Sequence, residues 1–155
     1  MFTRNASLLA LKSLGVADVF TRCFDSKALP HSLDVHFGPP DELFTASGNC
    51  EFGPLIPLLD DGSFRSVLFL DIMNRRQLHK RYVDDLRVDA IVYQGWQQYL
   101  ADLTISIADS GASDEELSAI AKTIGFDHPD STLTFLDAAS DVPWEQRHFE
   151  FIGAI

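Results

Sequence analysis

Two adjacent carboxylates, Asp60 and Asp61, are the first side chains in this sequence whose types and spacing could do chemistry. A pair of acids can serve as general acid and general base when one carboxyl group is protonated and the other is ionised. The pair precedes Gly62 in the stretch DDGS, and Asp and Gly are also the residue types that form tight turns. We therefore favour a turn here and keep the catalytic interpretation as an alternative.

Histidine and cysteine side chains offer two further kinds of chemistry. His31 and His36 flank Asp34, but their spacing matches no standard metal site. Cys23 lies on a predicted helical face between two phenylalanines, where a cysteine packs as a small apolar group rather than acting as a nucleophile. The sequence also lacks the nucleophile-elbow, phosphate-loop, dinucleotide-binding and H-E-x-x-H motifs. We expect no catalytic residue, no metal site and no cofactor.

Three other residues have structural interpretations. Asp71 ends the apolar run VLFLDI, where a carboxylate needs a partner or access to solvent. We expect it to accept backbone hydrogen bonds in the next turn. Trp96 and Trp144 are expected to anchor the core or an interface.

The charge of the chain is negative and unevenly distributed. Among 155 residues, 23 acids outnumber 12 bases, for a net charge of −11. Residues 1–100 hold 12 acids and 10 bases, whereas residues 101–155 hold 11 acids against Lys122 and Arg147 alone. Nucleic acid is an unsuitable ligand, because phosphate binding needs clustered bases. A basic protein partner is more plausible, although such acids can also serve only solubility.

The composition also bounds the class of protein. No apolar stretch reaches the roughly 18 residues of a membrane span, so no membrane contact is expected. Lys12 and Asp18 interrupt the apolar amino-terminal stretch, which we interpret as part of the fold rather than as a secretory signal. Two cysteines without C-x-x-C spacing favour a reduced, cytoplasmic protein.

Three strands are predicted around the acidic turn. Residues 55–59 (LIPLL) contain Pro57, which cannot donate to a ladder and indicates an edge strand or a bulge. Residues 67–72 (VLFLDI) are apolar on both faces and predict a central strand covered on both sides. Residues 77–83 (QLHKRYV) predict a half-buried strand. Residues 26–54, rich in Gly and Pro, are expected to be mostly turns.

Helices are predicted on either side of these strands. Residues 94–109 have apolar side chains at helical spacing, with Thr104 and Ser106 on the opposite side. Residues 113–125 begin with the capping box Ser113–Glu116 and stop at Gly125. Two shorter helical segments are expected within residues 6–24, and the tail is expected to form a strand at 132–136 and a helix starting near Pro143.

This order of elements predicts an α+β fold. The strands are too closely spaced for parallel crossovers, so a central antiparallel or mixed sheet is expected, flanked by N-terminal and C-terminal helices. No linker or repeat divides the chain, so residues 1–155 are expected to form one domain.

The central region also carries a family resemblance. Residues 53–109 contain the run GPLIPLLDDGSFRSVLFLDI, then a polar strand, then VYQGWQQYLADL. This order of segments resembles the SUKH superfamily. In the amino-terminal part, only ALP at residues 28–30 resembles the family pattern. The resemblance implies a mixed layer of six or fewer strands and a role as a bacterial immunity protein. Such proteins bind a toxin delivered by a contact-dependent or type VI secretion system, and are not generally enzymes.

The resemblance and the charge lead to one functional hypothesis. We expect the chain to neutralise a cognate, basic, nuclease-type toxin by occluding its active site, through acidic residues in turns. The candidate contacts are Asp60, Asp61, Asp84, Asp85 and Asp89. One alternative is a non-catalytic regulatory or scaffold module, and another is a small-molecule-binding domain or enzyme with a pocket lined by His31, His36 or Cys23.

Overall fold

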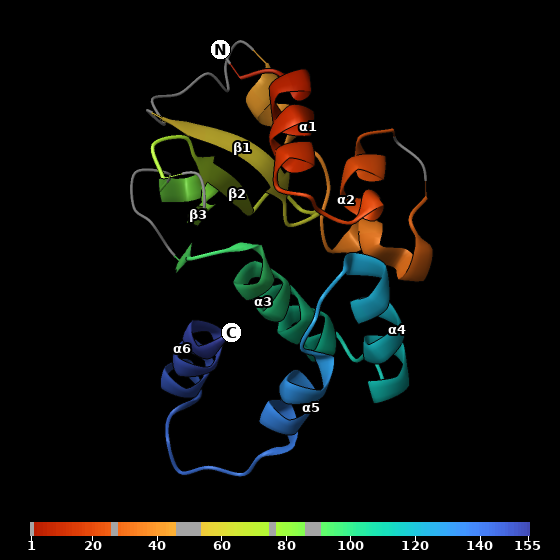
Figure 1. The fold of residues 1–155 in the computed structure, drawn as a ribbon, viewed down its shortest axis with the longest axis vertical. Coiled ribbons are helices and arrows are strands. Elements are labelled where there is room, and N and C mark those ends of the chain that lie inside the picture. The colour runs from red at the N-terminus through yellow and green to blue at the C-terminus, as the bar shows by residue number, and fades with distance from the viewer. Residues whose placement is uncertain (1, 26–27, 46–53, 75–76, 86–90) are drawn as a thin grey trace.

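A computed structural model describes the fold of this chain over residues 2–25, 28–45, 54–74, 77–85 and 91–155 (Figure 1). Its strands form an antiparallel sheet of order β1-β2-β3-β4 within the described residues. Their bounds are Leu55–Asp60, Ser66–Asp71, Leu78–Tyr82 and Ile91–Tyr93. The predicted α+β class is confirmed, with N-terminal and C-terminal helices flanking the sheet.

The first two strands have the positions that their sequences predict. β1 lies at one edge of the sheet, and its register with β2 shifts between Pro57 and Leu59. The shift accommodates the missing N–H of proline. β2 is central and buried on both faces: Leu68 and Leu70 belong to the main core, while Val67 and Phe69 belong to a smaller cluster.

Helix α1 packs on the sheet, and α2 packs against α1. Helix α1 contacts β1, and Ser7 Oγ donates a hydrogen bond of 2.5 Å to the carbonyl oxygen of Pro57. The elements of this region are α1 (Arg4–Ser13), α2 (Asp18–Arg22) and the 3₁₀ segments η1 (Cys23–Asp25), η2 (Pro30–Val35) and η3 (Asp41–Phe44). The described part of residues 26–54 is therefore turns and short 3₁₀ helices, as predicted.

The C-terminal half is helical. Its elements are the 3₁₀ segment η5 (Val83–Asp85), followed after β4 by α3 (Trp96–Asp109), α4 (Asp114–Ile124), α5 (Pro129–Asp137) and α6 (Trp144–Ala154). The capping box of Ser113 and Glu116 is formed, and Gly125 ends α4 in the left-handed conformation. Helix α3 runs between the sheet and the other C-terminal helices (Figure 1).

The central position of α3 corrects one prediction. Thr104 was expected on an exposed side of this helix, but it is buried, and its hydroxyl donates to the carbonyl oxygen of Leu100. Helices α4, α5 and α6 as well as β4 contact α3, so more of its circumference is buried than the amphipathic pattern predicts. Only Ser106 of the predicted polar pair is exposed.

A second prediction was wrong. Residues 132–136 were expected to form a strand, but they belong to α5, which begins at Pro129. Proline at the first helical position favours helix initiation, and the Thr132 hydroxyl donates to the carbonyl oxygen of His128. The apolar residues of this helix, Leu133, Phe135 and Leu136, pack against the main core, and this packing outweighs the strand preference of the alternating sequence. The helix expected near Pro143 is confirmed as α6.

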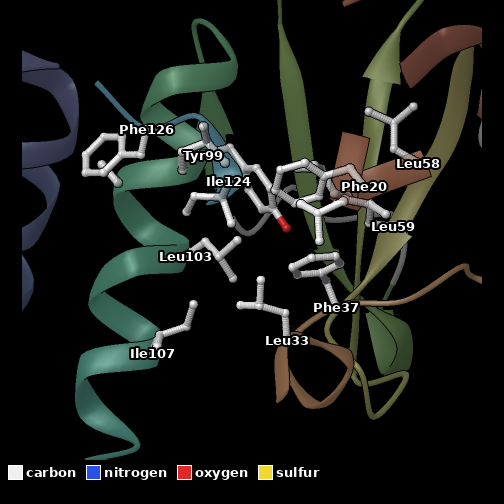
Figure 2. Close-up of a cluster of buried hydrophobic side chains, with 14 of the residues drawn as sticks. Phe20, Leu33, Phe37, Leu58, Leu59, Tyr99, Leu103, Ile107, Ile124 and Phe126 are labelled. Atoms are coloured by element: carbon white, nitrogen blue, oxygen red, sulfur yellow. The ribbon is translucent and has the colours of Figure 1, made fainter. Parts of the chain in front are cut away.

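A single main core joins both halves of the chain. Figure 2 shows Phe20 and Phe37 from the N-terminal segments facing Tyr99 and Leu103 of α3, with Leu59 of β1 beside them. The rings of Phe20 and Phe37 lie 4.6 Å apart between centroids. This core holds α3 rigidly against the sheet and so places the polar groups described next.

Candidate functional site

The acidic turn between β1 and β2 is a structural turn. Asp61 accepts hydrogen bonds from the backbone N–H groups of Ser63, Arg65 and Ser66. Burial alone would raise the pKa of Asp61, but these bonds, with those from the two serine hydroxyls, outweigh burial and lower it. The Asp61 carboxylate is therefore ionised and held by its own turn.

Asp60 has a different environment. Its Oδ1 accepts a 2.8 Å hydrogen bond from the N–H of Gly62. Partial burial is the main effect on this carboxyl and raises its pKa to about 6, although the hydrogen bond from Gly62 acts to lower the pKa. Asp60 and Asp61 thus titrate differently, but both are engaged in the turn, which supports the turn interpretation over a catalytic pair.

The other predicted contact residues lie at the same end of the sheet. Asp84 and Asp85 are exposed in η5, and the N–H of Val83 donates 2.9 Å to the carbonyl oxygen of Arg65 beside the acidic turn. The structure thus brings four of the five candidates to one end of the sheet. Asp89 lies outside the described residues.

A buried carboxylate that the sequence analysis did not single out lies on α3. The Tyr93 hydroxyl donates to Oδ2 of Asp102, and Lys80 Nζ lies 3.4 Å from the same oxygen. Nε2 of His148 lies 2.9 Å from Oδ1, close enough for an ion pair although its N–H is not aligned for a hydrogen bond. One carboxylate therefore links α3 to β3, β4 and α6.

The electrostatics of this cluster favour the ionised form of Asp102. Burial by itself would raise the pKa of Asp102, but the contacts with His148, Lys80 and Tyr93 outweigh it and lower the pKa to about 2. Burial and the neighbouring Asp102 charge raise the pKa of Tyr93 well above its ordinary value, so its hydroxyl keeps its proton. A signal was present in the sequence, since Asp102 follows Tyr99 by three residues and so borders the predicted buried face.

A groove of about 520 Å³ lies between β4 and α6, and Tyr93, Asp102 and His148 of the cluster are among its lining residues. Its walls are Ile91, Val92, Tyr93, Gln94, Gln98, Asp102, Trp144, Glu145, His148, Phe149, Ile152 and Gly153. Three large apolar side chains of the groove are exposed to solvent: Phe149 by 79%, Trp144 by 42% and Val92 by 40%. Large apolar groups around a hollow mark a binding site more often than scattered ones do.

Aromatic stacking and one arginine hold the α6 side of the groove. Phe135 of α5 stacks on Phe151 with 4.4 Å between ring centroids, and it also contacts Trp144 at 5.3 Å. The Arg147 guanidinium lies over the Phe135 ring and donates to the carbonyl oxygens of Phe135 and Ala138. One of the two bases of residues 101–155 is thus used to join α5 to α6.

The C-terminal third of the chain exposes many acids. Residues 101–155 are all described, and every acid among them except Asp102 is exposed. These exposed acids are Asp109, Asp114, Glu115, Glu116, Asp127, Asp130, Asp137, Asp141, Glu145 and Glu150. The C-terminal helices therefore present a surface of strongly negative charge.

The remaining predicted residues do not converge on one site. Burial is the main cause that raises the pKa of Cys23 to about 12, so its thiol is protonated and suits the predicted apolar role. His36 lines a cavity of about 40 Å³ that Asp60 and Asp61 also line, whereas Cys23 lines a separate hollow. Within the described parts of the chain, no three His, Cys, Asp or Glu side chains are arranged to hold a metal ion.

The two structural predictions for Asp71 and Trp96 are confirmed. Asp71 Oδ1 accepts hydrogen bonds of 2.8 and 3.1 Å from the N–H groups of Met73 and Asn74. Trp96 packs against the core, with its ring 4.9 Å from Phe20 between centroids.

Comparison with known proteins gives no assignment. No family model, no curated protein and no solved structure matches this chain. The SUKH resemblance therefore depends on the motifs within residues 53–109 alone. In the described portion of the chain, none of the helices has the length and apolar character needed to cross a membrane.

Proposed function

We propose that this protein is an immunity protein that binds a basic bacterial toxin and occludes its active site in the cytoplasm. The observation that carries the proposal is the groove between β4 and α6, which combines exposed aromatic side chains with Glu145 in a part of the chain that exposes ten acids. The resemblance of residues 53–109 to SUKH immunity proteins supports the same class. Occlusion needs no catalytic group on the inhibitor itself.

The charge supports fast recognition of a basic partner. Residues 101–155 carry ten exposed acids but only two bases, and one of these bases, Arg147, donates to backbone carbonyls. Complementary charge raises association rates from about 10⁵–10⁶ to about 10⁸–10⁹ M⁻¹s⁻¹ at low salt. Association with the toxin should therefore slow steeply as salt is added.

The aromatic groove supports affinity. Tryptophan and tyrosine are over-represented among the few residues that dominate binding energies at interfaces. Trp144 has a rigid position here, because it contacts Phe135 and stacks on His148 at 5.7 Å. The predicted contact residues in η5 and the acidic turn, Asp84 and Asp85 above all, would then add negative charge to the binding surface at the end of the sheet that carries this turn.

The test is co-expression with the product of the adjacent gene, which the proposal expects to be the toxin. The wild-type chain should rescue growth and co-purify with the toxin. Phe149→Lys should weaken binding at least tenfold, whereas Met73→Lys should not. Met73 is a matched control, because it is 83% exposed, carries the same change in charge and lies outside the groove. A lack of both rescue and co-purification would refute the proposal.

One observation favours a second candidate, a small-molecule-binding domain. The groove volume is within the range of ligand pockets, about 300–1,000 Å³, and its lining includes the Asp102–His148 pair. A screen of small cationic ligands for thermal stabilisation tests this candidate. The effect should disappear in Phe149→Lys if the ligand occupies the groove.

A further inference from the structure

Strand β4 forms an open edge of the sheet. It pairs with β3 through Leu78–Tyr93, His79–Val92 and Lys80–Ile91, and no described strand pairs with its other side. Successive residues of a strand direct their N–H and C=O groups alternately to its two sides. Either Val92 or its two neighbours therefore present a backbone donor and acceptor at the outer edge.

The opposite edge of the sheet is better protected. In β1, Pro57 removes a donor, and Asp60 makes a two-way backbone bridge to Gly38. Proline and covering segments are the usual devices that prevent strand addition at an edge. The contrast makes β4 the edge at which an added strand meets less obstruction.

The outer edge of β4 opens into the groove. All of Ile91, Val92 and Tyr93 line it, together with Gln94, so the groove follows the strand along its whole length. The chain bends at Gln94 and Gly95, and the Gln94 N–H donates to Gln98 Oε1, so the edge available to a further strand is that of residues 91–93. A strand added here would have Trp144 and Phe149 of α6 on its far side.

Charge decides which occupant suits this position. A second copy of the chain would bring a further net charge of −11 toward a groove whose wall already holds Glu145. Like charges facing each other at an interface cost several kcal/mol. A basic segment instead meets Glu145 in the groove wall and Glu150 on the same helix.

We propose that β4 accepts an extended, basic segment of the partner protein as an additional strand, with an apolar side chain of that segment inserted between β4 and α6. Main-chain bonds supply affinity in this mode, and pockets for alternate side chains supply specificity. The inference depends on the proposed function and specifies how its partner is held.

The probes are three short synthetic peptides with blocked ends. One alternates Lys and Val, one alternates Glu and Val, and the third is the Lys–Val peptide with alternate backbone amides N-methylated. N-methylation keeps the side chains and charge but removes the N–H donors that a ladder needs. The protein remains wild type, so no failure to fold confuses the result.

Binding is followed by ¹H–¹⁵N NMR at the β4 amides and at the Trp144 indole. The Lys–Val peptide should shift these signals and protect a β4 amide from exchange, the Glu–Val peptide should bind at least tenfold more weakly, and N-methylation should weaken binding at least tenfold. N-methylated and unmodified peptides of equal affinity would overturn strand addition. An absence of shifts at β4 would also overturn it. So would dimerisation of the protein in sedimentation that is accompanied by shifts of the β4 amides without peptide.

The two proposals can fail separately. Rescue from the toxin without any peptide binding at β4 would remove strand addition and leave the immunity role. Peptide binding at β4 without toxin rescue would support strand addition and remove the immunity role.

Discussion

Replacing Asp102 with asparagine tests whether the buried charge cluster stabilises the fold. Asparagine keeps the shape of the side chain and an oxygen that accepts from Tyr93, but it removes the negative charge that faces Lys80 and His148. The variant therefore isolates the charge from the packing.

The size of the effect follows from the shift in pKa. The contacts from His148, Lys80 and Tyr93 outweigh burial and lower the pKa of Asp102 from 3.8 to about 2. At about 1.4 kcal/mol per pKa unit, the ionised form contributes roughly 2 kcal/mol at pH 7. Because the folded-state pKa is lowered, this stability is present above pH 3.8 and is lost as the pH falls through 2; about half remains at pH 3.

Urea unfolding followed by circular dichroism at pH 7, 4 and 3 measures this free energy. Asp102→Asn should lower the free energy of unfolding by roughly 2 kcal/mol at pH 7, and the deficit should shrink to about half at pH 3. Asp109→Asn, an exposed position on the same helix, is the control and should change little. Equal stability of Asp102→Asn and wild type at pH 7, or a deficit that does not change with pH, would refute the reasoning.

Three further predictions concern local features. Ser113→Ala removes the cap of α4 and should lower the free energy of unfolding by about 1 kcal/mol, with amide exchange accelerated in its first turn. Asp60→Asn should raise the free energy of unfolding by about 1 kcal/mol at pH 8 and leave it unchanged at pH 4, as measured by urea unfolding. Partial burial raises the Asp60 pKa to about 6, so ionisation costs stability as the pH rises from 3.8 through 6, and solvent screening limits the cost. Gly62→Ala should lower the melting temperature, because φ is +79° and the new Cβ would lie 2.6 Å from the carbonyl oxygen of Val35; an unchanged value would contradict this.

Much of the local structure could be predicted from the sequence because neighbouring residues carry it. The turn at Asp61 is made by hydrogen bonds within five residues, and the cap at Ser113 within three. The bulge at Pro57 follows from a single missing N–H. β4 escaped prediction because three residues are too few to show a period.

The candidate site required contacts between distant parts of the chain. Lys80, Tyr93, Asp102 and His148 come from four elements, and no spacing in the sequence relates them. The groove exists only because α6 packs beside β4, and the exposure of Phe149 depends on that packing.

The sequence by itself determined the class of the fold, the acidic charge of the C-terminal third, and the turns, strands and caps whose hydrogen bonds are local. Only the tertiary structure decided which acids stay at the surface and which one is buried. The physical reason is that a carboxylate such as Asp102 tolerates burial only when a cation and hydrogen-bond donors from other elements contact it. The packing of those elements determines whether these groups come together. Likewise, the alternating residues of α5 became a helix because packing of Leu133, Phe135 and Leu136 against the main core outweighs a weak local preference.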